Sequence, residues 1–387
     1  MLIQSIKLTN VLSFGPDTQE LELKPLNVLI GPNGSGKSNL IEVIGLLQAA
    51  PKNLLTPIRE GGGVRDWIWR GEPKARSAQI EAILYYPKGQ ALRYCLGFAE
   101  KGQWFDLTEE RLQNERADPG HSEPYFYYEM KNGRAVLNYK DEGQRDLRPE
   151  DIDREQSIFA QRKDPDHYPE LTYIGNQFGQ IRSYREWSFG RNTTPRLPQK
   201  PDLPNDFLME DGSNLGLVLN RLKREPQAKS QLLKALRQLY EGINDLDVSI
   251  EGGTVQVFLD EGKIIVPATR LSDGTLRYLC LLAILCHPTP TPLVCIEEPE
   301  LGLHPDILPG LAELLREASE RCQLIVTTHS DVIIDALTDT PESVVICEKQ
   351  KVQTILKRLD KDDLAHWLER YRLGDLWTSG ELGGNRW

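Results

Sequence analysis

The glycine-rich stretch at residues 31–38 constrains the fold of this chain more than any other feature. It matches the pattern G-x-x-x-x-G-K-[ST] at every fixed position, follows an apolar run at 26–30 and precedes a helical run at 39–47. A strand, a glycine loop and a helix in this order form a phosphate-binding loop (P-loop), because the glycines let successive backbone N–H groups point at phosphate oxygens. The alternative, a chance glycine turn, does not explain both flanking elements.

The loop residues have distinct predicted roles. Lys37 is predicted to neutralise the β- and γ-phosphates of ATP, and Ser38 to ligate Mg²⁺. The partial positive charge of the helix N-terminus adds to the attraction for phosphate. The predicted ATP-binding residues of this stretch are Gly31, Pro32, Asn33, Gly34, Ser35, Gly36, Lys37, Ser38 and Asn39.

Composition limits the class of protein. The chain has 387 residues, of which 39% are hydrophobic, enough for a packed core in two domains or in one large domain with an insertion. Its net charge of −11 argues against a protein coated in nucleic acid, but allows a local basic groove. The six cysteines form no C-x-x-C pair, there is no signal peptide, and the longest apolar run is too short to cross a bilayer. We therefore expect a soluble, cytoplasmic protein with buried thiols and no membrane partner.

An acidic motif follows a second predicted buried strand. The apolar run at 293–296 ends in three acids within four residues, Glu297, Glu298 and Glu300. Carboxylates at the carboxyl end of such a strand suit a metal–phosphate site. We predict that Glu297 holds Mg²⁺ through water and that Glu298 polarises the water that attacks ATP. An ordinary acidic turn is the alternative.

Two further motifs stand at the ends of predicted elements. Ser272 and Gly274 open an apolar helix that runs to about residue 286, and such a helix N-terminus is either an anion site or an ordinary N-cap. His329 ends a buried strand at 324–328 and is predicted to contact the γ-phosphate, although a lone histidine is more often structural. The run at 344–347 is predicted to be the last parallel strand.

The chain divides into three predicted parts. Residues 1–160 hold the P-loop and an antiparallel β-subdomain, with strands expected near 77–86 and 91–98 and a hairpin turn at 132–133. Residues 161–265 hold an irregular, proline-rich stretch at 164–205, a helical stretch at 214–240 and two strands. Residues 266–387 hold the later motifs and a docked tail. Prolines and β-like alternation between the motifs exclude a long coiled-coil arm.

The order of these motifs resembles the ABC-type ATPase heads of the RecF/SMC-like class. It looks closest to the AAA-type ATPase domain of the OLD (overcoming lysogenization defect) family. The resemblance covers about residues 1–50 and 265–350 and implies an α/β P-loop NTPase of the ABC/RecF-like type. Such a fold has a mixed central sheet with helices, an antiparallel β-subdomain and an inserted helical lobe. The stretch after His329 is too short for the Toprim nuclease of OLD proteins, which needs on the order of a hundred residues.

The resemblance also implies roles for individual residues. Gly31, Gly36, Lys37 and Ser38 match the Walker A motif, and Glu297 and Glu298 match Walker B. Ser272 and Gly274 match the signature motif, which in such families reaches the γ-phosphate held by the opposite subunit, and His329 matches the switch histidine. The implied catalytic residues are Glu298, His329 and Lys37, and the implied metal ligands are Ser38 and Glu297. Either Gln177 or Gln180 matches the Q-loop glutamine.

Two residues depart from the family pattern. Glu297 stands where aspartate is common, which lengthens the arm that reaches Mg²⁺ by one methylene group. Asp273 replaces a signature glycine and places a carboxylate near phosphate. Such a carboxylate slows turnover or needs a local cation.

Three functions remain open. The first is an ATPase that forms an ATP-dependent head-to-tail homodimer and acts on DNA or on a DNA-acting partner such as a separate nuclease, in phage defence or DNA repair. The second is a nucleotide-gated protein scaffold with slow hydrolysis. The third, a transporter motor, lacks a membrane-coupling segment. The family context is an analogy.

Local basic clusters are the only sign of direct DNA binding in this acidic chain. The first lies at 182–200, with Tyr184 and Trp187 placed to stack on bases, and the second at 221–237. The alternative is a solvated helix face with arginines bound to nearby carbonyls or acids. The residues are Arg182, Arg185, Arg191, Arg196 and Lys200 in the first cluster, and Arg221, Lys223, Arg224, Lys229, Lys234 and Arg237 in the second.

Overall fold

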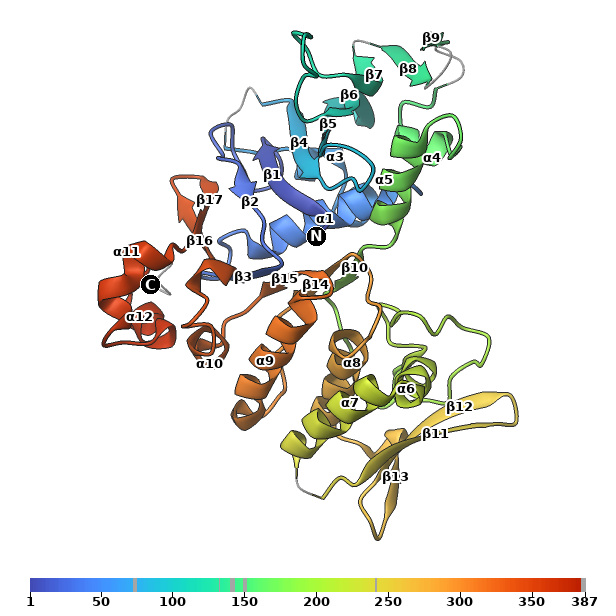
Figure 1. Ribbon diagram of the computed structural model, residues 1–387, viewed down its shortest axis with the longest axis vertical. Coiled ribbons are helices and arrows are strands. Elements are labelled where there is room, and N and C mark those ends of the chain that lie inside the picture. Colours follow the sequence, from blue (N-terminus) through green and yellow to red (C-terminus); the bar gives the residue numbers. More distant parts are fainter. Residues whose placement is uncertain (72–74, 132, 140–142, 149–151, 241, 384–387) are drawn as a thin grey trace.

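The computed structural model describes residues 1–71, 75–131, 133–139, 143–148, 152–240 and 242–383, which form three sheets and the helices around them (Figure 1). A six-stranded core sheet lies across the middle of the molecule. An eight-stranded antiparallel sheet covers one side of it, and the other side carries helices and a small three-stranded sheet. The longest described helix, α7 (Pro226–Leu239), has 14 residues, so no coiled-coil arm leaves the described chain.

The core sheet brings the motif-bearing strands together. Its strand order is β10-β14-β15-β3-β16-β17, and every pair is parallel except β16–β17. The strands are β3 (Leu26–Ile30), β10 (Arg182–Tyr184), β14 (Leu293–Glu297), β15 (Gln323–Thr327), β16 (Val344–Gln350) and β17 (Gln353–Arg358). Because the strands are parallel, the loops that follow β3, β14 and β15 meet at one edge of the sheet.

Side chains alternate between the two faces of the core sheet. Leu293 and Cys295 of β14 pack with helix α1 (Lys37–Ala49) and the antiparallel sheet. Val294 and Ile296 of the same strand pack with the helices on the opposite side. Burial on both faces explains why the strand is a continuous apolar run in the sequence. In Figure 1 the helices on this opposite side, α6 to α9, lie below the sheet.

The antiparallel sheet confirms the predicted β-subdomain. Its strand order is β2-β1-β4-β5-β6-β7-β8-β9. The strands are β1 (Ile3–Thr9), β2 (Leu21–Glu22), β4 (Ser77–Leu84), β5 (Leu92–Lys101), β6 (Trp104–Asn114), β7 (Phe126–Lys131), β8 (Arg134–Tyr139) and β9 (Gly143–Leu147). Strands β7 and β8 pair as the predicted hairpin, although Asn132 of its turn lies outside the described residues. Short helices flank this part: α2 (Leu55–Glu60), α3 (Val64–Trp67), α4 (Ile158–Gln161) and α5 (Pro169–Gly179).

The structure corrects two predictions of secondary structure and confirms a third. The stretch at 164–205 is not wholly irregular, because α5 begins at Pro169, whose ring fits the first turn of a helix, and β10 joins the core sheet. The helical stretch at 214–240 is two helices, since Pro226 begins a new one. The run at 344–347 lies in β16, which is the last parallel strand, as predicted. A turn at Lys351, with a positive φ of 57°, then returns the chain as the antiparallel β17, which was not predicted.

The remaining elements build the lower lobe and the C-terminal region. They are α6 (Leu215–Arg224), β11 (Asp245–Glu251), β12 (Thr254–Asp260), β13 (Ile265–Pro267), α8 (Asp273–Leu285), α9 (Leu308–Ser319), α10 (Asp331–Asp335), α11 (Lys361–Leu368) and α12 (Leu373–Ser379). Short 3₁₀ turns lie at Ala268–Arg270, Pro305–Ile307 and Pro341–Ser343. Helix α12 is docked through buried Leu373 and Trp377, as predicted for the tail, while residues 384–387 lie outside the described part. All six cysteines are buried and free. Among the described helices, none is both long enough and apolar enough to cross a membrane.

One buried acid links folding to pH. Glu110 in β6 is fully buried and accepts hydrogen bonds from the Tyr94 hydroxyl at 2.7 Å and from the Ile158 N–H at 2.8 Å. Burial raises the pKa of Glu110 from 4.5 to about 7. Between these two pH values Glu110 is protonated in the folded state and ionised in the unfolded state. Its contribution to the free energy of unfolding is fully present below pH 4.5 and is lost as the pH rises through about 7.

We expect the free energy of unfolding to fall between about pH 5 and about pH 8 by up to about 3 kcal/mol more in the wild type than in Glu110→Gln. Urea unfolding of both proteins across this range measures the difference. The same pH slope in both proteins would show that Glu110 does not carry the effect.

Candidate functional site

The glycines of the P-loop are required by its geometry. Gly31 has a φ of 147°, and a Cβ there would lie 2.2 Å from the Cys347 carbonyl oxygen. Gly36 has a φ of 102°, and a Cβ there would lie 2.2 Å from the Thr354 hydroxyl. The loop therefore curls tightly before α1, while Asn33 and Gly34 are exposed at its crest. This is the conformation in which backbone N–H groups can surround a phosphate.

Polar groups of the same loop fit a nucleotide phosphate. Lys37 is only 6% exposed, and its ammonium donates hydrogen bonds to the carbonyls of Gly31 at 2.9 Å and Pro32 at 3.0 Å. Burial lowers the pKa of Lys37. The buried Ser35 hydroxyl has no hydrogen-bond partner among the described residues, so it is available for a phosphate oxygen. Asn39 instead donates to the Ser13 hydroxyl at 2.7 Å, which makes it a support of the loop.

Ser38 and Glu297 meet as a metal site requires. The Ser38 hydroxyl donates a hydrogen bond to Oε1 of Glu297. Glu297 is the last residue of β14, whose end lies at the same edge of the core sheet as the P-loop. A hydroxyl and a carboxylate oxygen are ligands that Mg²⁺ accepts, with waters and substrate phosphates completing its shell. Within the described part of the chain, no three His, Cys, Asp or Glu side chains form a closed metal cage. The donor set therefore fits a metal that is shared with a nucleotide.

Arg185 is an unpredicted member of this site. It follows β10 directly, and its Nε donates to Oε2 of Glu297 at 3.1 Å. The charge pattern of the sequence placed Arg185 in a predicted DNA-binding cluster. Its actual partner, Glu297, lies more than a hundred residues away and gives no local signal. In the described structure, no hydrogen bond joins Gln177 or Gln180 to Ser38 or Glu297. The choice between these glutamines stays open.

Glu298 has a strained backbone at the point where the chain leaves β14. Its φ is +45°, in the left-handed region that non-glycine residues rarely adopt. Its N–H donates to the Thr327 carbonyl at 3.0 Å, and its own carbonyl accepts from the Arg277 guanidinium at 3.1 Å. The His329 Nε2 lies 3.6 Å from the Glu298 carboxylate. The structure thus places two of the three predicted catalytic side chains, Glu298 and His329, next to each other.

Glu300 fixes the loop that carries His329. Its carboxylate accepts from the Thr328 hydroxyl and from the His329 N–H, both at 2.7 Å. Burial raises the pKa of Glu300. The sequence showed Glu300 only as the third acid of the motif. Its role as a support became visible only with the hydrogen bonds to the neighbouring strand end.

The predicted signature residues lie at the exposed start of α8. Ser272 is its N-cap and accepts from the Thr275 N–H at 3.0 Å. A Cβ on Gly274 would lie 2.6 Å from the Gly302 carbonyl, so only glycine fits there. In the described chain, no hydrogen bond or ion pair joins Ser272 or Gly274 to the P-loop. Ser272 and Asp273 are exposed, and so is the nearby Leu301.

Three of the five basic residues of the first cluster bind within the protein, while Arg191 and Lys200 are exposed. Arg182 donates to the carbonyls of Gly179 and Ile181, and Arg185 pairs with Glu297. Arg196 is buried and pairs with Asp273. Tyr184 is 3% exposed, which excludes base stacking. For these arginines the alternative, arginines bound to carbonyls and acids, is the correct interpretation.

Comparisons with known proteins give a matching family and similar folds. The family model described as "AAA domain, putative AbiEii toxin, Type IV TA system" matches residues 26–335. The fold is similar to an SMC head bound to the C-winged helix domain of ScpA, with a TM-score of 0.59, 12% identity and coverage of 94% of this chain and 99% of that one. It is also similar to an SMC head with an extended coiled coil bound to the C-terminal domain of ScpA from Pyrococcus furiosus, with a TM-score of 0.61, 13% identity and coverage of 95% and 99%. No curated protein matches the chain in sequence.

These findings confirm the predicted fold class, an α/β P-loop NTPase of the ABC and SMC-head type. They do not name the OLD family, so that resemblance remains a prediction. The matched range contains the P-loop, the signature, the acidic strand end and His329. The chain therefore belongs to the AAA domain family whose description names the AbiEii toxin of type IV toxin–antitoxin systems.

Proposed function

We propose that this protein hydrolyses ATP and that two copies close head to tail around two ATP molecules. The observation that supports hydrolysis most strongly is the meeting of Ser38, Glu297, Glu298 and His329 beside the P-loop. These residues lie at or just after the ends of three core strands, β3, β14 and β15, and have the chemistry that phosphoryl transfer to water needs.

Each residue has a role that its position supports. Lys37 leaves the loop carbonyls and binds the β- and γ-phosphates. Ser38 and Glu297 would hold Mg²⁺, which would supply positive charge to the phosphates. Glu298 accepts a proton from the attacking water, and His329 contacts the γ-phosphate with its backbone fixed by Glu300. Arg185 remains beside Glu297 and keeps its carboxylate in place.

The exposed signature supports a site shared between two copies. In the described chain, no hydrogen bond or ion pair joins Ser272 to the P-loop of the same copy. The N-terminus of α8 can nevertheless bind an anion, because its free N–H groups carry partial positive charge. A second copy in head-to-tail orientation would bring this N-terminus to the γ-phosphate on the first copy. Both sites would then form together, as twofold symmetry requires.

The direct test is phosphate release at saturating ATP and Mg²⁺. The wild type is expected to turn over, and Lys37→Ala is expected to lose nucleotide binding. Arg65→Ala, a change in an exposed basic residue away from the motifs, is the matched control and is expected to keep wild-type turnover. Equal turnover by wild type and Lys37→Ala would contradict the proposal.

We further propose that the ATPase acts in a DNA-related process, phage defence or DNA repair, with a separate effector such as a nuclease. The family description names a toxin–antitoxin system, and both SMC heads are bound to a ScpA domain. These relatives support a protein partner by analogy.

A nucleotide-gated scaffold without direct DNA binding is the second candidate. It is favoured because basic residues of both clusters already have partners within the protein. In the second cluster, Lys223 pairs with Asp247 at 2.9 Å. Fluorescence anisotropy with DNA across a salt series, using Glu298→Gln with ATP, separates the two. Binding that weakens steeply with salt, and less steeply after charge reversal at Arg221 and Arg224, supports DNA. No binding at low salt supports the scaffold.

A further inference from the structure

An ion pair between buried Arg196 and exposed Asp273 lies at the signature loop, which we define as residues 271–274. Arg196 is 8% exposed, and its Nη2 donates to Oδ1 of Asp273 at 2.5 Å. The same guanidinium donates to the carbonyls of Leu271 at 2.5 Å and Phe189 at 3.1 Å. The side chain of Asp273 is 67% exposed. The arginine is therefore anchored in the protein, and the carboxylate lies at the surface.

The position of Asp273 makes its charge matter. It stands between Ser272 and Gly274, at the first turn of α8. A carboxylate is favourable at a helix N-terminus, but it repels a second anion that binds to the same N-terminus. A phosphate can approach this loop only if the charge of Asp273 is offset or turned aside.

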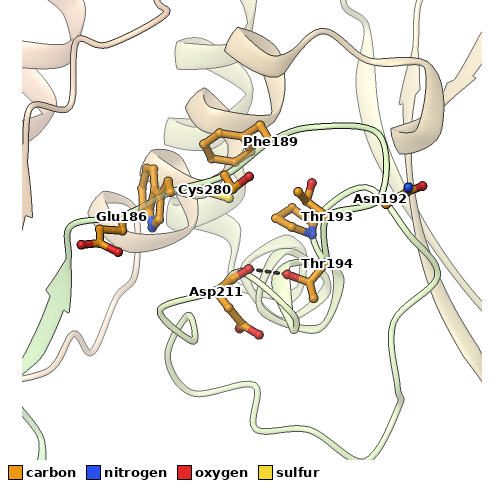
Figure 2. Close-up of a pocket in the computed structure, with 11 residues that line it drawn as sticks. Glu186, Phe189, Asn192, Thr193, Thr194, Asp211 and Cys280 are labelled. Atoms are coloured by element: carbon orange, nitrogen blue, oxygen red, sulfur yellow. Dashed lines mark hydrogen bonds between the residues drawn. The ribbon is translucent and has the colours of Figure 1, made fainter. Parts of the chain in front are cut away.

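Arg196 also holds the end of the segment at 186–195. Residues 186–195 run from the metal site to the signature loop over the side of α8. This segment borders a cavity of about 230 Å³, which Phe189, Thr193, Asp211 and Cys280 of α8 help to line (Figure 2). The contacts of Arg196 with Asp273 and with backbone carbonyls fix the end of this segment beside the signature residues.

We propose that Arg196 is a charge-compensating and positioning residue of the signature loop, which lets Ser272 and Gly274 receive the terminal phosphate of a nucleoside triphosphate held by a second copy. The guanidinium turns the Asp273 carboxylate toward itself and offsets its charge. It also orders the Leu271 carbonyl, one residue before the N-cap. This inference rests on the proposed two-copy site. It explains how a signature with a carboxylate in place of glycine tolerates a phosphate.

The test compares Arg196→Gln, Asp273→Asn and the double variant by ATP binding to the monomer, ATP-dependent dimerisation and hydrolysis. Arg196→Gln is expected to bind ATP as the wild type does, because the P-loop is untouched. Its ATP-dependent dimer is expected to weaken at least about tenfold, because the remaining carboxylate is no longer paired. Adding Asp273→Asn is expected to restore most of the dimerisation. If Arg196 acted only by holding backbone carbonyls, the double variant would dimerise as weakly as Arg196→Gln, because both lack the arginine.

Several results would overturn the proposal. Wild-type dimerisation by Arg196→Gln, or failure of the double variant to recover, excludes charge compensation. A tenfold loss in Asp273→Asn alone would show that the carboxylate itself is needed. If Arg196→Gln does not fold, as judged by thermal unfolding, Arg196→Lys tests the charge instead: it keeps the positive charge and is expected to keep most of the dimerisation, and a tenfold loss in Arg196→Lys would contradict charge compensation. If the wild type itself shows no ATP-dependent dimer, the proposed function fails, and that outcome is distinct from failure of Arg196→Gln alone.

Discussion

Glu298→Gln is expected to bind ATP with wild-type affinity and to hydrolyse it at least about a hundredfold more slowly. The amide has the size of the carboxylate, so the contacts of Glu298 with Thr327 and Arg277, which are made by its backbone, persist. The contact between Ser38 and Glu297 also persists, and Mg²⁺ binding with it. The amide cannot accept the proton of the attacking water.

Single-turnover hydrolysis and equilibrium binding of a fluorescent ATP analogue measure the two quantities separately. Lys37→Ala is the matched control, because it should weaken binding itself. Wild-type turnover by Glu298→Gln would show that another group activates the water.

Ser272→Arg is expected to abolish hydrolysis while ATP binding to the P-loop of the same chain stays intact. A large side chain at this N-cap fills the space for the terminal phosphate on the second copy, so neither composite site of a Ser272→Arg dimer can close. Mixing Ser272→Arg with Lys37→Ala should restore part of the activity, because one site of each mixed dimer then combines an intact P-loop with an intact signature.

The matched control for this mixture replaces Lys37→Ala with a chain that carries both substitutions, which leaves no intact composite site. Phosphate release by the two mixtures, at equal protein concentration, is the measurement. Normal turnover by a monomeric Ser272→Arg protein would refute the shared site.

The elements that bear the motifs could be predicted from sequence because their signals are local. Strands β3, β14 and β15 are buried on both faces, so each appears as a continuous apolar run. The P-loop and α8 are marked by glycine and cap residues that their backbone geometry requires. The family match agrees with this part of the prediction.

The edge of the core sheet and the supports of the site could not be predicted in this way. Strand β10 has three residues in a proline-rich stretch, too few to show a pattern. Arg185 and Arg196 looked like a charged surface because their partners, Glu297 and Asp273, are far along the chain. For Asp273 the sequence left slow turnover or a local cation open; the structure shows a cation beside it, Arg196, which the charge pattern had placed in a DNA-binding cluster.

The mass of Glu298→Gln in solution, measured by sedimentation velocity without nucleotide, with ADP and with ATP and Mg²⁺, tests the shared ATP site most directly. This variant retains ATP, so the closed state can accumulate. A shift toward the dimer with ATP but not with ADP, lost when Ser272→Arg is added, is the predicted result. A protein that binds ATP fully and remains monomeric at every concentration tested would contradict it.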